Sequence, residues 1–176
     1  MIPNFDDQGN LPSGVIQSTL KEFEERFVKG VIGSQTRKDI FLGYKEYCKD
    51  LLPLNVATKQ WVNGSYTTNK KDPNDIDLVT HLDALKANNK AIYEQLVHLI
   101  VNKSDVVNKY KCHVFGIAVY PPDHELYRET LKWKTYWMEC FGQDRQKRLK
   151  GIIEFDLTDG NFRLSDELAQ GETNNG

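Results

Sequence analysis

Two short stretches of the sequence decide the fold, Gln60-Trp61-Val62-Asn63-Gly64-Ser65 and, after a spacer of nine residues, Asp75-Ile76-Asp77-Leu78-Val79. The first predicts a short strand that ends at the turn residues Asn63 and Gly64. The second predicts another strand, reached through a polar loop over residues 66–74. Because residues two apart in a strand face the same side, Asp75 and Asp77 are expected to lie next to each other.

Apolar residues at helical intervals surround these strands. Thr19 and Glu22 have capping-box spacing and predict a helix that starts there. A second helix follows Ser34 and is stopped by Pro53. Further helices are expected over about 82–101 and from Pro121-Pro122 to Gly142, and further strands over 112–120 and 152–157. In the last helix, Trp133 and Trp137 are expected to lie in the core, with stacking on a base as the minor alternative.

These segments predict an α/β (α+β) fold, with a small mixed sheet of about four to five strands flanked by helices. The 176 residues suit one domain over residues 1–158, with an irregular arm at 1–16 and a polar tail at 159–176. The chain shows no membrane-length apolar run and no secretory start, so we expect a cytoplasmic location and no membrane partner.

The histidines and cysteines suggest no metal cluster of their own. The three cysteines lie far apart without a CxxC pattern, and His81, His98, His113 and His124 lack ligand spacing, so all are predicted to be structural. The formal net charge is -2. A polyanionic ligand would therefore have to be held by local basic residues or by metal ions.

The two aspartates and the Gly-Ser turn are the residues that indicate chemistry. Neighbouring carboxylates repel each other, and a hard divalent ion such as Mg²⁺ between them relieves the repulsion and leaves room for phosphate oxygens. A Gly64-Ser65 turn offers backbone N–H groups and a hydroxyl to a phosphate. Phosphoryl transfer needs both parts, so the combination is more informative than either motif alone.

Taken together, Gly64-Ser65, the nine-residue spacer and Asp75-Ile76-Asp77 resemble the signature of the DNA polymerase β nucleotidyltransferase superfamily. The resemblance implies a nucleotidyltransferase core that moves a nucleoside monophosphate from an NTP or dNTP to a hydroxyl and releases pyrophosphate. It also implies that Ser65 contacts the triphosphate and that Asp75 and Asp77 bind two Mg²⁺ or Mn²⁺ ions.

The same resemblance implies a third acid on a later strand. The segment Gly151-Ile152-Ile153-Glu154-Phe155-Asp156-Leu157 offers Glu154 and Asp156 on one face. Apolar flanks favour Asp156 as the catalytic third metal ligand, with Glu154 as the alternative, and simple solvent exposure of one or both stays open.

Two basic groups are candidate phosphate-binding residues. One is Lys70 and Lys71, between the Gly-Ser turn and Asp75. The other is the loop that carries Arg145, Lys147, Arg148 and Lys150. Each group fits contact with a triphosphate or a nucleic-acid backbone, or an ordinary solvated surface.

The chain resembles a minimal, stand-alone member of the superfamily, since the residues after Asp77 supply only the remaining core. It also resembles a poorly characterised bacterial family in Pro3-Asn4-Phe5-Asp6, Leu11-Pro12-x-Gly14, Phe141-Gly142-x-Asp144-Arg145 and Lys150-Gly151-Ile152. We expect template-independent oligonucleotide synthesis, as in Hailong-type antiphage systems, with the product controlling an effector protein. The alternatives are an antitoxin that AMPylates a partner toxin, and an inactive module that binds a nucleotide or a partner.

Overall fold

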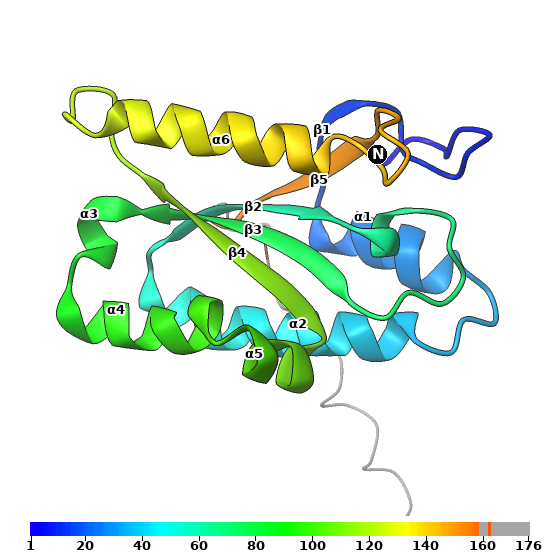
Figure 1. The fold of residues 1–176 in the computed structure, drawn as a ribbon. Coiled ribbons are helices and arrows are strands. Elements are labelled where there is room, and N and C mark those ends of the chain that lie inside the picture. The colour runs from blue at the N-terminus through cyan, green and yellow to red at the C-terminus, as the bar shows by residue number, and fades with distance from the viewer. Residues whose placement is uncertain (159–161, 163–176) are drawn as a thin grey trace, which may run out of the picture.

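A five-stranded mixed sheet forms the centre of the computed structural model, which describes residues 1–158 and 162 (Figure 1). The strand order is β1-β5-β2-β3-β4. β1 and β5 are parallel, β2 is antiparallel to both of its neighbours, and β3 and β4 are parallel. The bounds are β1 Gly14–Gln17, β2 Ala57–Asn63, β3 Ile76–Asp83, β4 Cys112–Val119 and β5 Gly151–Asp156. This arrangement confirms the predicted mixed α/β architecture.

Helices cover both faces of the sheet (Figure 1). One face, here called the core face, packs against α1, α2, α4 and α5, and α6 crosses the other face, here called the cleft face. The bounds are α1 Leu20–Glu24, α2 Arg37–Leu51, α3 Ala84–Ala87, α4 Lys90–Leu96, α5 Lys103–Tyr110 and α6 Tyr127–Phe141. A π-helical turn, Glu25–Lys29, continues α1, and another, Val97–Val101, continues α4.

Side chains alternate between the two faces along each strand. The core face carries a continuous apolar layer that includes Val62, Leu78 and Phe155. Phe23 of α1 packs edge-on against Phe155, with ring centroids 5.3 Å apart. The cleft face has a smaller cluster of buried residues, namely Trp61, Val79, Ile117, Phe141 and Ile152. The aromatic core face therefore supplies most of the apolar burial that holds the fold.

Local signals in the sequence predicted several elements correctly. The Thr19 hydroxyl accepts a hydrogen bond from the Glu22 backbone N–H at 3.2 Å, and the Glu22 carboxylate accepts one from the Thr19 N–H, as the capping box predicts. α2 follows Ser34 and ends before Pro53. Both helix starts are decided by residues adjacent in sequence, which is why the pattern alone was sufficient.

The single helix predicted over 82–101 is wrong. β3 continues to Asp83, whose carboxylate accepts hydrogen bonds from the N–H groups of the first turn of α3. The Asn89 side chain does the same for α4, so each of these side chains starts a new helix where one long helix was expected. α5 was not predicted.

The N-terminal arm and the last helix also need correction. The strand β1 occupies Gly14–Gln17, inside and just beyond the arm predicted over 1–16, because it pairs in parallel with the distant β5. On α6, Trp133 is 45% exposed, so only Trp137 joins the cleft-face cluster.

Of the predicted tail, residues 159–161 and 163–176 lie outside the described residues. Phe162 is described, and its ring centroid lies 5.4 Å from that of Phe155. Across the described part of the chain, the helices are all too short or too polar to cross a membrane.

Candidate metal centre

The parallel pairing of β3 with β4 brings two aspartates and a histidine together. Asp77 is in register with His113 on one side and with Asn63 on the other, and Asp75 directly precedes β3. The His113 Nδ1 atom lies 3.7 Å from Asp75 Oδ2 and 3.5 Å from Asp77 Oδ1. One ligand atom from each of the three residues falls within 4.8 Å of the others. Two carboxylates and an imidazole at this spacing form a donor set that fits one divalent cation.

The charges of this cluster favour a cation. Burial raises the pKa of Asp77, and the neighbouring carboxylate of Asp75 raises it further, while His113 and Lys150 act in the opposite direction. The side chains of Asp75 and Asp77 are each less than a third exposed, so water screens their repulsion incompletely. A bound cation would remove this repulsion and favour the ionised form of both carboxyl groups.

The turn that follows β2 lies directly against Asp77. Gly64 has φ +83°, and a Cβ atom at this position would lie 2.0 Å from Asp77 Oδ2. Asn63 holds the turn in place, since its side-chain amide donates to the carbonyl oxygens of Phe141 and Gly151, each at 3.0 Å. Gly64 is therefore required both by its backbone conformation and by the space that the Asp77 carboxylate occupies.

A cavity of about 630 Å³ opens above these residues. Its volume is in the range typical of small-molecule sites. Among its lining residues are the two clustered aspartates, the turn residues, four basic side chains and three aromatic side chains, namely Asp75, Asp77, Gly64, Ser65, Lys70, Arg145, Arg148, Lys150, Phe115, Trp137 and Phe141.

Lys150 is the basic residue most firmly built into this cavity. It is 7% exposed, and its Nζ donates to the Gly64 carbonyl oxygen at 3.1 Å. Burial lowers its pKa, whereas the charges of Asp77 and Asp144 raise it. Lys150 thus places its amino group against the Gly-Ser turn, close enough to Asp77 for their charges to interact.

The other predicted basic residues differ in availability. Lys70 and Arg145 are exposed, line the cavity, and within the described chain their side chains make no hydrogen bond or ion pair. Arg148 is engaged, because its Nε donates to Asp144 Oδ2 at 2.6 Å and its Nη1 donates to Gln8. The Lys71 side chain lies against Gly33, outside the cavity lining. Lys70 and Arg145 are therefore the cavity cations free to meet a ligand.

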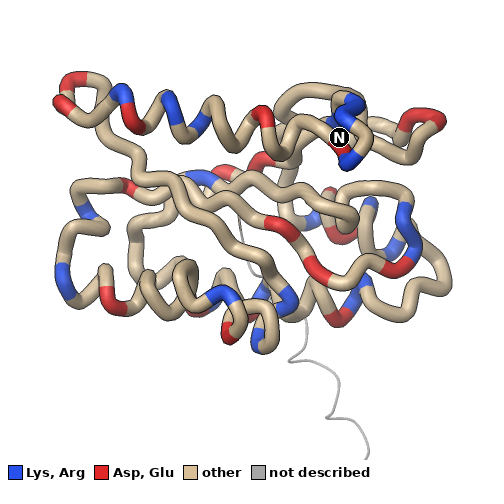
Figure 2. Tube along the Cα trace, viewed as in Figure 1, with Lys and Arg blue, Asp and Glu red and all other residues tan. Residues whose placement is uncertain are grey.

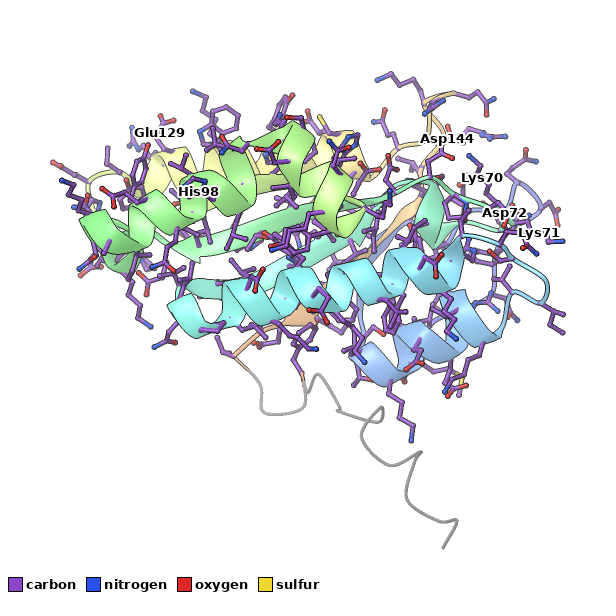
Figure 3. All side chains as sticks on the ribbon, turned by 90° about the horizontal axis from the view of Figure 1, so that it is seen from below. Lys70, Lys71, Asp72, His98, Glu129 and Asp144 are labelled. Atoms are coloured by element: carbon purple, nitrogen blue, oxygen red, sulfur yellow. The ribbon has the colours of Figure 1, made fainter. Side chains whose placement is uncertain are left out.

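The loop between α6 and β5 is tied to the N-terminal segment. Asp144 accepts hydrogen bonds from the backbone and side chain of Arg148 and from the Asn10 amide. Burial raises the pKa of Asp144, but these hydrogen bonds outweigh it and hold the pKa at about 2. Figure 3 shows Asp144 and Lys70 at the same end of the molecule, opposite His98 and Glu129. The two basic segments thus approach one cavity.

The predicted third acid requires correction. Asp77 is in register with Asn63, whereas Glu154 pairs with Trp61 and Asp156 with Lys59, both farther along β2 and on its opposite side. The strand β2 therefore separates both acids from Asp75 and Asp77. The group of potential ligands around those aspartates contains His113 and neither β5 acid.

Glu154 and Asp156 have other partners. The Glu154 carboxylate accepts hydrogen bonds at 2.6 Å from Lys59 Nζ, Trp61 Nε1 and Gln17 Nε2. Burial raises the pKa of Glu154, but the hydrogen bonds from these donors lower it by more, so the pKa lies below the usual value. Asp156 accepts from the backbone and hydroxyl of Thr158. Glu154 therefore links β5 to β1 and β2 through side-chain hydrogen bonds.

Two important residues were missed from the sequence. His113 was assigned a structural role, because only the β3–β4 register shows its proximity to Asp77. Arg37 was overlooked, although its fully buried guanidinium holds the loop after the Gly-Ser turn. It donates to backbone carbonyl oxygens of Phe27, Tyr66, Thr68, Lys70 and Lys71. A signal existed for Arg37: a basic residue in the first turn of a helix, where the helix dipole disfavours it.

Comparison with known proteins assigns the family alone. No curated protein and no solved structure matches the chain. A family model described as "Family of unknown function (DUF6932)" matches residues 3–156, which is most of the chain. The chain therefore belongs to the DUF6932 family.

Proposed function

We propose that this protein is a metal-dependent nucleotidyltransferase, which transfers a nucleoside monophosphate from an NTP or dNTP to a hydroxyl group and releases pyrophosphate. The observation that carries the proposal is that Asp75 and Asp77, with His113 beside them, line one cavity with the Gly64-Ser65 turn and Lys150. Candidate cation ligands and candidate phosphate-binding groups thus share a cavity whose volume suits a nucleotide.

Each group has a distinct part in this reaction. Asp75, Asp77 and His113 would hold a divalent ion, which supplies charge stabilisation at the reacting phosphate and lowers the pKa of the attacking hydroxyl. Ser65 would donate to a phosphate oxygen. Lys150, Arg145 and Lys70 would neutralise the charge that develops on the leaving pyrophosphate.

The donor set bears on which metal is bound. Carboxylate oxygens suit both Mg²⁺ and Mn²⁺, whereas an imidazole nitrogen binds transition-metal ions, Mn²⁺ among them, better than it binds Mg²⁺. His113 in place of a third carboxylate therefore shifts the preference from Mg²⁺ towards Mn²⁺. The same aspartates would hold the second ion expected from the sequence, which would supply further charge stabilisation to the substrate phosphates.

The acceptor remains as proposed from the sequence, the hydroxyl of another nucleotide, in template-independent synthesis of an oligonucleotide. Lys and Arg are interspersed with Asp and Glu along the described chain (Figure 2), and the formal net charge of -2 gives an extended nucleic-acid template little overall attraction. A short nucleotide acceptor carries few phosphates and needs few basic residues for binding, so it suits such a surface.

The direct test is incubation of the purified protein with each α-³²P-labelled NTP or dNTP and Mg²⁺ or Mn²⁺. We expect pyrophosphate release and labelled oligonucleotides, both lost in Asp77→Asn. Asp156→Asn is the matched control, because Asp156 lies on the far side of β2, and this variant should retain activity. Undiminished turnover by Asp77→Asn would contradict the proposal. Label on an added partner protein would identify an AMPylating antitoxin, and metal-dependent nucleotide binding without product would identify a binding module.

A further inference from the structure

The strand order places different chemical groups in sequence across the cleft. Lys150 directly precedes β5, Gly64 and Ser65 follow β2, the aspartates lie at the start of β3, and Phe115 lies on β4. Because these strands neighbour one another in the order β5-β2-β3-β4, about 4.8 Å apart, the cavity has a cationic end and an aromatic end. The metal ligands lie between the two ends.

The aromatic end consists of Phe115 and Trp137. Phe115 shares a face of β4 with His113, two positions along the strand. Trp137 of α6 lies against it, with ring centroids 4.4 Å apart and the ring planes inclined by 40°. Phe141 supports Trp137 edge-on, at a centroid distance of 5.7 Å. Both Phe115 and Trp137 line the 630 Å³ cavity beside the aspartates.

These two rings are not fully covered by protein. Phe115 and Trp137 are both half-buried and also border a second cavity of about 460 Å³ along β4. Trp133 lies one helical turn earlier on α6 and is more exposed, but it does not line the cavity that Asp75 and Asp77 line. α6 thus carries one tryptophan at the site and one beside it, which provides a natural internal control.

We propose that Trp137, supported by Phe115, is the stacking platform for the base of the substrate nucleotide. The inference rests on the proposed function and assigns the direction of the ligand: base against Trp137, α-phosphate at the aspartates, and remaining phosphates towards Ser65 and Lys150. A cleft that bound only inorganic phosphates would gain nothing from an apolar wall, whereas every nucleobase has a π-face that stacks on an aromatic ring. Purines, with the larger ring system, are favoured over pyrimidines.

Direct binding separates the base contribution from the phosphate contribution. The probes are α,β-methylene ATP, α,β-methylene CTP and inorganic tripolyphosphate, each titrated in the presence of Mg²⁺ by calorimetry. Trp137→Leu should weaken binding of the ATP analogue roughly five- to hundredfold, the loss expected when one base–aromatic stack is removed, and leave tripolyphosphate binding unchanged. Trp133→Leu should change neither. Wild type should bind the ATP analogue more tightly than the CTP analogue.

Fluorescence provides a second readout that a purely structural role of Trp137 would not produce. In the Trp133→Leu background, the ATP analogue should quench tryptophan emission and tripolyphosphate should not. Equal affinity of wild type and Trp137→Leu for the ATP analogue would contradict the stacking role of Trp137 but not the proposed phosphate and metal site. Equal weakening of tripolyphosphate and the ATP analogue by Trp137→Leu would also overturn it. Failure of wild type to bind either probe would remove the proposed function as well.

Discussion

The two faces of the sheet are built differently. The core face is a continuous aromatic and aliphatic layer in which Phe23, Phe27 and Phe155 are fully buried. The cleft face buries fewer apolar residues and places charged or polar groups among them, including Glu154, His81 and Lys150. α6, which covers this face, buries only Thr130 and Phe141 along its length. The core face thus supplies stability, and the cleft face holds the groups suited to chemistry.

The largest expected contrast between the faces is seen with Asp77→Asn. Activity should fall at least about a hundredfold, because a metal ligand loses its charge. Stability should not fall. The raised pKa of Asp77 means that the folded state favours the protonated carboxyl group and disfavours the carboxylate. The stability that this residue contributes is therefore complete below its pKa in the unfolded chain and is lost as pH rises through its pKa in the folded protein. At neutral pH without metal, the variant should melt at the same or a higher temperature by differential scanning calorimetry; a clear drop would contradict this division.

Phe23→Ala on the core face should show the reverse pattern. Removal of this fully buried ring, which packs against Phe27, Tyr66 and Phe155, should lower the free energy of unfolding by about 3–5 kcal/mol. Urea unfolding measures this loss. Metal affinity of the folded fraction at low temperature should match that of wild type. A selective loss of metal binding with unchanged stability would show that the faces are not separable.

Gly64→Ala tests the junction between the turn and the metal cluster. The new methyl group would lie against the Asp77 carboxylate, in an essentially glycine-only backbone conformation (φ +83°, ψ -161°) that costs roughly 1–3 kcal/mol for other residues. We expect this modest loss of stability together with at least a tenfold loss of Mn²⁺ affinity in calorimetry. Gly14→Ala, at a position with φ +116° and no atom within 4 Å of the added Cβ, is the control for backbone strain alone. Similar Mn²⁺ affinity in both variants would refute the contact argument.

The smallest expected effect is a pH dependence from His81. This residue lies edge-on to Trp61, and its Nε2 is buried without a hydrogen-bond partner among the described residues. Burial lowers the pKa of His81 to about 4, so the unfolded chain takes up the proton first, and stability falls as pH drops from about 6.5 towards 4. His81→Leu should reduce the dependence of the thermal unfolding midpoint on pH in this window. An unchanged slope would show that other groups dominate.

Features of the fold and site could be predicted from the sequence where the interacting residues are close together along the chain. The Thr19–Glu22 cap, the helix after Ser34 and the pairing of Asp75 with Asp77 depend on neighbours in sequence and were predictable. The strand β1, the candidate ligand His113 and the buried Arg37 depend on distant contacts. The prediction of a third acid was wrong for the same reason. The alternation in β5 correctly placed Glu154 and Asp156 on one face, but it could not show which residues of β2 they pair with.

The central claim is that Asp75, Asp77 and His113 hold a divalent ion, and Mn²⁺ binding measured by electron paramagnetic resonance tests it most directly. Wild type should bind Mn²⁺ stoichiometrically, Asp77→Asn should lose binding, and His113→Ala should bind more weakly, with a smaller preference for Mn²⁺ over Mg²⁺. The exposed His98, at the other end of the molecule (Figure 3), supplies the matched control, and His98→Ala should behave like wild type. Absence of Mn²⁺ binding by wild type, or equal binding by Asp77→Asn, would contradict the account.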